Sequence, residues 1–117
     1  MPSTTISNES TIQHDVLDYL NRFPGWFIWR QGGHAVYDPI RRVFRKPGKF
    51  EMKGRSDLVG TYKGKIICLE IKTPEGRISP DQAVFLKKIK DLGGYAWILR
   101  SLTEAVELRK AVENGLV

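Results

Sequence analysis

The chain has 117 residues, 41% of them hydrophobic, which is the size and composition of a single domain with one core, spanning residues 1–117. Its one cysteine, Cys68, excludes an intramolecular disulfide and a cysteine-based zinc cluster. The formal net charge of +6 favours a polyanionic partner. The N-terminal segment is polar and no stretch approaches the roughly 18 apolar residues of a membrane helix, so we expect a cytoplasmic protein without a membrane partner.

The first part of the chain predicts a helix and then an aromatic strand. Apolar residues recur at helical spacing over 12–23, where Ser7 or Asn8 can cap the helix and Pro24-Gly25 can end it. Residues 26–31, "WFIWRQ", are aromatic and β-branched enough to form a strand. We interpret the tryptophans as core residues rather than as platforms for stacking bases; they are Trp26, Trp29 and Trp97.

A basic segment, "RRVFRKPGKFEMKGR" (residues 41–55), follows this strand. Its seven arginines and lysines face one glutamate, so it carries a net charge of +6 and the rest of the chain sums to zero. Phe44 and Phe50 are interleaved with the cations, and Pro47-Gly48 interrupt the run. This pattern predicts a basic loop or an irregular hairpin that contacts phosphates, with a plain solvated basic surface as the alternative.

The middle of the chain predicts a β-hairpin. Residues 57–62 and 65–72 are the two strands, and residues 63–64, Lys-Gly, form a two-residue turn. The register of that turn places Asp57 opposite Glu70, with their Cβ atoms roughly 4.5 to 5.5 Å apart. A longer loop that shifted the pairing by one residue would move Asp57 to the opposite face, so the predicted pair depends on the turn.

The second strand of this hairpin carries charged groups in an apolar sequence. Alternation along it puts Glu70 and Lys72 on the same face as Asp57. Adjacent carboxylates repel unless a proton or a cation lies between them, and two carboxylates with a backbone carbonyl such as that of Ile71 suit Mg²⁺ or Mn²⁺. Lys72 can then polarise a water or neutralise charge on a phosphate in the transition state. A simple edge-strand salt bridge between Glu70 and Lys72 is the alternative interpretation.

The next helix has strong boundary signals. Ser79 is predicted as the N-cap, Pro80 as the first helical residue and Gln82 as the partner in a capping box, and Gly93 ends the helix. Gln82 lies on the helix stripe that faces the core. An amide is therefore expected at the end of a core-facing row.

The last part of the chain predicts a strand and a helix. Residues 95–100 are apolar, and the long crossover before them favours a strand parallel to the preceding one. Ser101 and Glu104 offer a second capping box for the last helix. The predicted fold class is therefore α/β, a mixed β-sheet flanked by helices in the order α-β-β-β-α-β-α, in which Cys68 packs as a small apolar residue.

The combination of these motifs resembles the PD-(D/E)xK nuclease superfamily and, within it, the virus-type replication-repair nuclease (VRR-NUC) domain. The segments "KGRSDLVG", "CLEIKTPEGRISPDQAVFL" and "GGYAWIL" carry the resemblance, which covers nearly the whole chain. Ser56 stands where the superfamily name has a proline. The resemblance implies a restriction-endonuclease-like core and a metal-dependent, structure-specific DNA endonuclease that cuts four-way (Holliday) junctions as a homodimer. It also implies the cytoplasm of a bacterial or phage-infected cell.

The resemblance also implies roles for single residues. Asp57 and Glu70 would bind Mg²⁺ or Mn²⁺, Lys72 would be the catalytic lysine, and Gln82 would be the accessory glutamine beside the site. Glu9, on the first helix, would be a further metal ligand; its alternative role is to complement the dipole at the N-terminus of that helix.

We expect DNA contacts from the basic segment and from the residues that follow the catalytic strand. The preferred contacts are Lys49, Lys53 and Arg55, because they lead directly into Asp57. The other candidates are Arg45, Lys46, Arg77 and Ser79. Replication or repair proteins are candidate partners that the sequence does not specify.

Two other functions fit the same residues. One is a non-catalytic DNA-binding module of the same fold, in which Asp57, Glu70 and Lys72 form only a buried ionic cluster. The other is a nuclease that acts on flap or linear DNA, or on RNA, instead of junctions. Metal binding and a comparison of substrates would separate these functions.

Overall fold

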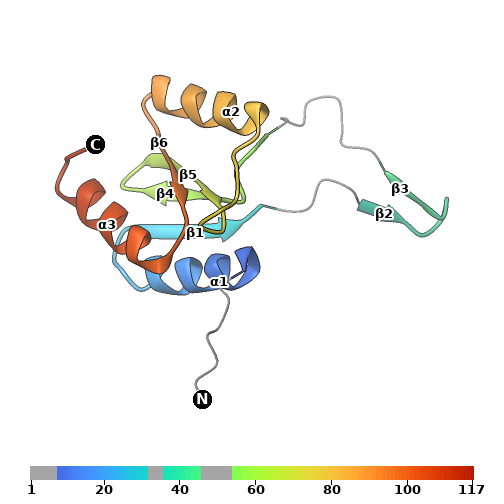
Figure 1. Ribbon diagram of the computed structural model, residues 1–117, viewed down its shortest axis with the longest axis horizontal. Coiled ribbons are helices and arrows are strands. Elements are labelled where there is room, and N and C mark those ends of the chain that lie inside the picture. The colour runs from blue at the N-terminus through green and yellow to red at the C-terminus, as the bar shows by residue number, and fades with distance from the viewer. Residues whose placement is uncertain (1–7, 32–35, 46–53) are drawn as a thin grey trace, which may run out of the picture.

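The computed structural model describes residues 8–31, 36–45 and 54–117, and these residues form a mixed α/β structure (Figure 1). The helices are α1 (Glu9–Leu20), α2 (Pro80–Asp91) and α3 (Leu102–Glu113). The strands are β1 (Trp26–Arg30), β2 (Val36–Asp38), β3 (Val43–Arg45), β4 (Leu58–Tyr62), β5 (Lys65–Ile71) and β6 (Tyr95–Leu99). None of the described helices has the length and apolar character needed to span a membrane.

The element order differs from the predicted one by an additional pair of strands. β2 and β3 form a separate antiparallel hairpin, which stands apart from the main sheet in Figure 1. The predicted irregular structure from residue 41 is therefore in part a regular hairpin, because aromatic and β-branched residues occur on both sides of the turn. The rest of the basic segment, through residue 53, lies outside the described residues.

The main sheet has the strand order β1-β4-β5-β6. β4 is antiparallel to β1 and β5, whereas β5 and β6 are parallel, as the long crossover predicted. Tyr62 pairs with Lys65 across the predicted two-residue turn. Lys63 and Gly64 have φ angles of 48° and 83°, and positive φ at both positions is typical of the type I′ turn that joins twisted strands. The predicted hairpin register is confirmed.

The two faces of the sheet are covered by different helices. Ile67 and Leu69 of β5 point into the larger core, which α1 and α3 complete. Cys68 points to the opposite face and packs with Leu86 of α2 and Ala96 of β6. The predicted alternation along β5 is confirmed, and Cys68 is a buried free thiol whose pKa is raised by burial.

The interpretation of the tryptophans as core residues is wrong for Trp29. Trp26 is buried and its indole N–H donates to Glu113 at 2.9 Å, and Trp97 is partly buried against the larger core. Trp29 is 41% exposed. Alternation along β1 turns Trp26 and Ile28 toward α1 and turns Trp29 to the other face, where α2 packs on β5 and β6.

The helix caps largely agree with the sequence. Asn8 caps α1, and α2 has the complete predicted capping box. Ser101 caps α3, but the second capping box is wrong, because Glu104 accepts the backbone N–H of Arg100 at 3.0 Å instead of that of Ser101. The glutamate thus reaches one residue further back, to the end of the preceding strand.

Candidate active site

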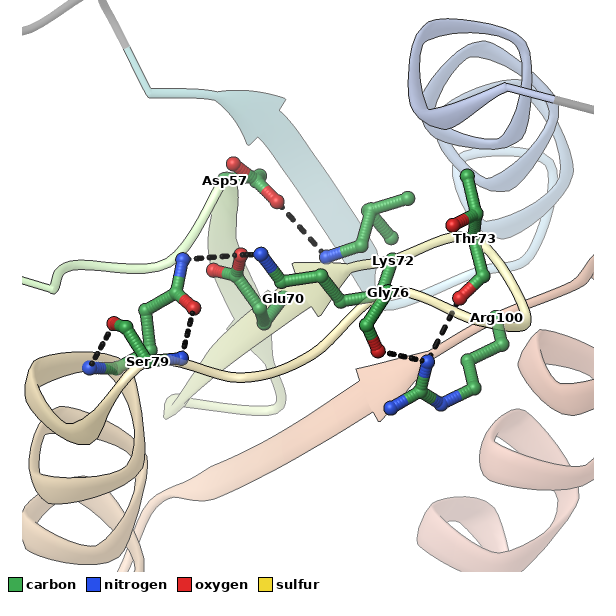
Figure 2. Close-up of polar contacts among 9 residues, drawn as sticks. Asp57, Glu70, Lys72, Thr73, Gly76, Ser79 and Arg100 are labelled. Carbon is green, nitrogen blue, oxygen red and sulfur yellow. Dashed lines mark hydrogen bonds and ion pairs between the residues drawn. The ribbon is translucent and has the colours of Figure 1, made fainter.

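The site lies where β4 begins and β5 ends, on the face that α2 covers (Figure 2). Asp57 directly precedes β4, and its Oδ2 accepts the backbone N–H of Ile71 at 2.9 Å. Its own carbonyl accepts the N–H of Gln31 at 2.9 Å, which extends the pairing with the β1 strand. The carboxylate therefore takes the place that a strand carbonyl would have in the ladder, and the backbone holds it beside Glu70.

The N-terminus of α2 orients Glu70. The side-chain oxygen of Gln82 accepts the backbone N–H of Ser79 at 2.9 Å, and Ser79 Oγ accepts the N–H of Gln82 at 3.1 Å. Because the capping box occupies the amide oxygen, the amide NH₂ group faces the sheet, and Gln82 Nε2 donates to Glu70 Oε2 at 2.8 Å. The helix cap thereby sets the direction of a hydrogen bond to the carboxylate.

Lys72 completes the group around Glu70. Its Nζ lies 3.6 Å from Glu70 Oε2, and only 15% of the lysine side chain is exposed. Glu70 itself is 1% exposed. Among the described residues its second oxygen, Oε1, is buried without a hydrogen-bond partner. A buried acceptor without a partner is costly, so this atom marks the place where a missing ligand would be most favourable.

The protonation of Glu70 reflects this environment. Burial raises the pKa of Glu70 to about 8, and the repulsion and hydrogen bond of Asp57 add to the increase, whereas Lys72 opposes it. Burial acts in this direction because it disfavours the charged carboxylate. Without a bound cation, the folded protein therefore favours the protonated form of Glu70 at neutral pH.

The donor set fits a hard divalent cation. Two neighbouring carboxylates, one of which has a buried oxygen without a partner, are the ligands that Mg²⁺ or Mn²⁺ prefers. Within the described part of the chain, no group of three or more His, Cys, Asp or Glu side chains is placed to hold a metal ion. A cation at Asp57 and Glu70 would therefore need waters, backbone carbonyls or phosphate oxygens as its other ligands.

The structure has different consequences for the two other predicted metal ligands, Glu9 and Ile71. Glu9 is exposed in the first turn of α1 and does not form a cluster with Asp57 and Glu70. Its position fits the alternative role, a charge that complements the helix dipole. The side chain of Ile71 is fully buried in the larger core and its N–H holds Asp57, so only its carbonyl is left as a ligand, and that role stays a prediction.

The predicted DNA contacts are only partly described. Lys46, Lys49 and Lys53 lie outside the described residues. Arg45 ends β3 in the separate hairpin, and Arg55 is partly buried ahead of Asp57. Arg77 is exposed in the loop between β5 and α2. Ser79 uses both its hydroxyl and its N–H in the capping box, which leaves it less available to a phosphate than predicted.

Gly54, the first glycine of "KGRSDLVG", brings the segment before Asp57 against α2. Its φ is +71°, a conformation that favours glycine. A Cβ atom at this position would lie 2.3 Å from the backbone carbonyl of Asp81, at the start of α2. The missing side chain therefore allows the close approach that places Asp57 near the helix cap.

Arg100 is a site neighbour that the sequence reasoning missed. It follows β6, and its Nη1 donates to the carbonyl oxygens of Thr73 and Gly76, each at 2.7 Å (Figure 2). These contacts hold the loop that starts directly after Lys72. The available signal was the parallel pairing of β5 and β6, which aligns Ile71 with Leu99 and so puts Arg100 level with Lys72.

Comparisons with known proteins add no family to these observations. A scan of the sequence against models of known protein families finds no match, and a search of curated proteins finds none. The functional interpretation therefore depends on the sequence motifs and on the geometry of the site.

Proposed function

We propose that the protein is a Mg²⁺- or Mn²⁺-dependent DNA endonuclease of the PD-(D/E)xK type with a restriction-endonuclease-like core, and that it cuts branched DNA as a homodimer. The observation that carries the proposal is the buried Glu70 Oε1. It has no hydrogen-bond partner among the described residues, at the point where Asp57, Lys72 and Gln82 meet. The basic segment, with its net charge of +6, supports a polyanionic substrate.

Each residue of the site has a separate role in this proposal. A bound Mg²⁺ or Mn²⁺ supplies Lewis-acid polarisation of phosphate and makes water a better nucleophile. Gln82 holds Glu70 Oε2, so that Oε1 stays available to a cation. Asp57 is held by the backbone of β5, so both carboxylates are positioned by strands and not by mobile loops.

Lys72 supplies positive charge at the same place. Its ammonium nitrogen lies 3.6 Å from Glu70 Oε2, which is farther than in a charge-assisted hydrogen bond. Because Lys72 Nζ makes no short hydrogen bond to Glu70, it would be available to donate to the phosphate, where negative charge increases during hydrolysis. Its low exposure keeps this interaction in a poorly solvated environment, where it is stronger than in water.

The experiment compares labelled four-way junction, flap, linear duplex and single strand, with an RNA duplex, in Mg²⁺, Mn²⁺ or EDTA. Glu70→Gln and Lys72→Met are the site variants, and Glu75→Gln, an exposed carboxylate in the following loop, is the matched control. Thermal unfolding checks that each variant is folded. We expect metal-dependent cleavage that Glu75→Gln retains and that each site variant reduces by at least about 100-fold.

The outcomes separate the alternatives. Paired incisions restricted to the junction support the homodimer and the branched substrate. Metal-dependent cutting of flap or linear DNA, or of RNA, supports the chemistry and changes the substrate. Full activity of both folded site variants contradicts the site. Tight DNA binding without cutting in any metal identifies the non-catalytic module, for which the contact between Glu70 and Lys72 is the supporting observation.

A further inference from the structure

Two aromatic side chains are exposed next to each other on the edge strand β1. Phe27 is 65% exposed and Trp29 is 41% exposed, and their ring centroids are 5.2 Å apart with the planes tilted by 48°. The residues between and before them, Ile28 and Trp26, are buried in the larger core. Exposed aromatic pairs are costly in water, and a ligand that covers them would remove this cost. We refer to Phe27 and Trp29 together as the aromatic platform.

The aromatic platform lies on the same face of the sheet as the candidate active site. Trp29 pairs with Val59 of β4, which packs with Cys68 on the α2 side. Two residues further along the strands, and so on the same face, the N–H of Gln31 donates to the carbonyl of Asp57. With a rise of about 3.4 Å per residue, Trp29 is about 7 Å and Phe27 about 14 Å along the strands from the level of Asp57. A chain of unpaired nucleotides that crosses the platform would reach the two carboxylates within a few nucleotides.

The charge distribution favours a nucleic acid over an apolar protein surface. The basic segment follows β1 in the sequence and ends at Arg55, two residues before Asp57, at the end of the sheet that holds the site. This arrangement attracts a polyanion to the end of the face where the platform begins. Two exposed rings also bury far less area than the roughly 800 Å² per partner of a stable protein interface.

We propose that Phe27 and Trp29 stack on unpaired bases of the strand that enters the candidate active site. The inference rests on the proposed function, since it concerns the substrate of the same site. In a duplex each base is covered by its neighbours, so only unpaired bases, such as those at the branch of a DNA, present a free face to a ring. The tilt between the two rings lets each of them contact a different base.

The test measures binding by fluorescence anisotropy in EDTA, so that no cleavage is needed. The probes are a single-stranded DNA, a single-stranded RNA of the same sequence and a fully paired DNA duplex. The double variant Phe27→Leu with Trp29→Leu keeps apolar side chains but removes both rings, while Phe27→Trp with Trp29→Phe keeps both rings. Leu92→Ala, at an exposed apolar position after α2, is the control.

We expect the leucine variant to bind single strands at least about tenfold more weakly, with duplex binding unchanged. The exchanged aromatic pair and Leu92→Ala should bind like the wild type. Tighter binding of the DNA or the RNA strand identifies the source of the unpaired bases.

Wild-type affinity of the leucine variant for single strands would overturn the inference, and so would an equal loss on the duplex. Sedimentation analysis tests whether a second copy of the protein covers the platform instead. Self-association that depends on these apolar side chains, with unchanged single-strand binding, would assign the platform to that second copy. Absence of cleavage, in contrast, would affect the proposed nuclease and not this binding result.

Discussion

In the absence of metal, replacing Glu70 by glutamine should stabilise the protein, and the gain should grow with pH. The folded protein raises the pKa of Glu70 from its ordinary value of 4.5 to about 8, mainly by burial. Between these two pH values the folded state keeps a proton that the unfolded state has released. Stability therefore falls as pH rises through this range, and the neutral glutamine removes that loss.

The size of the effect follows from the same two pKa values. The full difference corresponds to about 5 kcal/mol, and about 4 kcal/mol of it develops between about pH 5 and pH 9. A domain of this size is typically stable by about 5 to 15 kcal/mol, so the effect is a large fraction of the total. At about pH 9 the melting temperature of Glu70→Gln should exceed that of the wild type by at least about 10 °C.

Denaturant unfolding in EDTA at several pH values measures the effect. Subtracting the wild-type free energy of unfolding from that of Glu70→Gln cancels the titration of the other groups. Glu75→Gln, at an exposed position in the loop after β5, should differ from the wild type by less than about 0.5 kcal/mol at every pH. Asp57→Asn should reduce the slope without removing it, because burial is the larger cause of the raised pKa.

A constant difference between wild type and Glu70→Gln from about pH 5 to pH 9 would refute the reasoning. It would mean that Glu70 ionises in the folded protein at an ordinary pKa, and hence that the carboxylate is more solvated than its burial indicates. A difference of the opposite sign would mean that Lys72 outweighs both burial and Asp57.

The contacts around the site lead to three more expected outcomes. Ser79→Ala should lose about 1 kcal/mol of the free energy of unfolding at every pH. Gln82→Glu places a carboxylate beside Glu70, so its loss of stability should grow as pH rises. Denaturant unfolding at about pH 6 and pH 9 measures both effects. Arg100→Ala should accelerate amide hydrogen exchange in the loop after β5 at least about tenfold, and Arg100→Lys should have an intermediate effect. Equal exchange rates in the wild type and Arg100→Ala would refute the role of Arg100 in holding this loop. At about pH 7, Mn²⁺ binding should release close to one proton, measured by calorimetry in two buffers, and Glu70→Gln should abolish this release.

Local signals predicted much of this fold because each depends on a few neighbouring residues. The Lys-Gly turn sets the hairpin register, since positive φ at both positions joins twisted strands without an extra residue. That register, with the two-residue alternation of a strand, was enough to put Asp57, Glu70 and Lys72 together. Ser79 and Gln82 could be placed for the same reason, as a capping box is a local hydrogen-bond pattern.

The sequence alone therefore determined which charged groups meet at the end of β5, whereas the tertiary structure decided their surroundings. The pKa of Glu70 depends on burial beneath α2 and the Gln82 amide, and burial is a property of the packed molecule. The exposure of Trp29 depends on which strands α2 covers, and no local pattern states this. Arg100 reaches the loop after β5 only because two strands distant in sequence are parallel neighbours, a long-range pairing that the packing of the whole sheet selects.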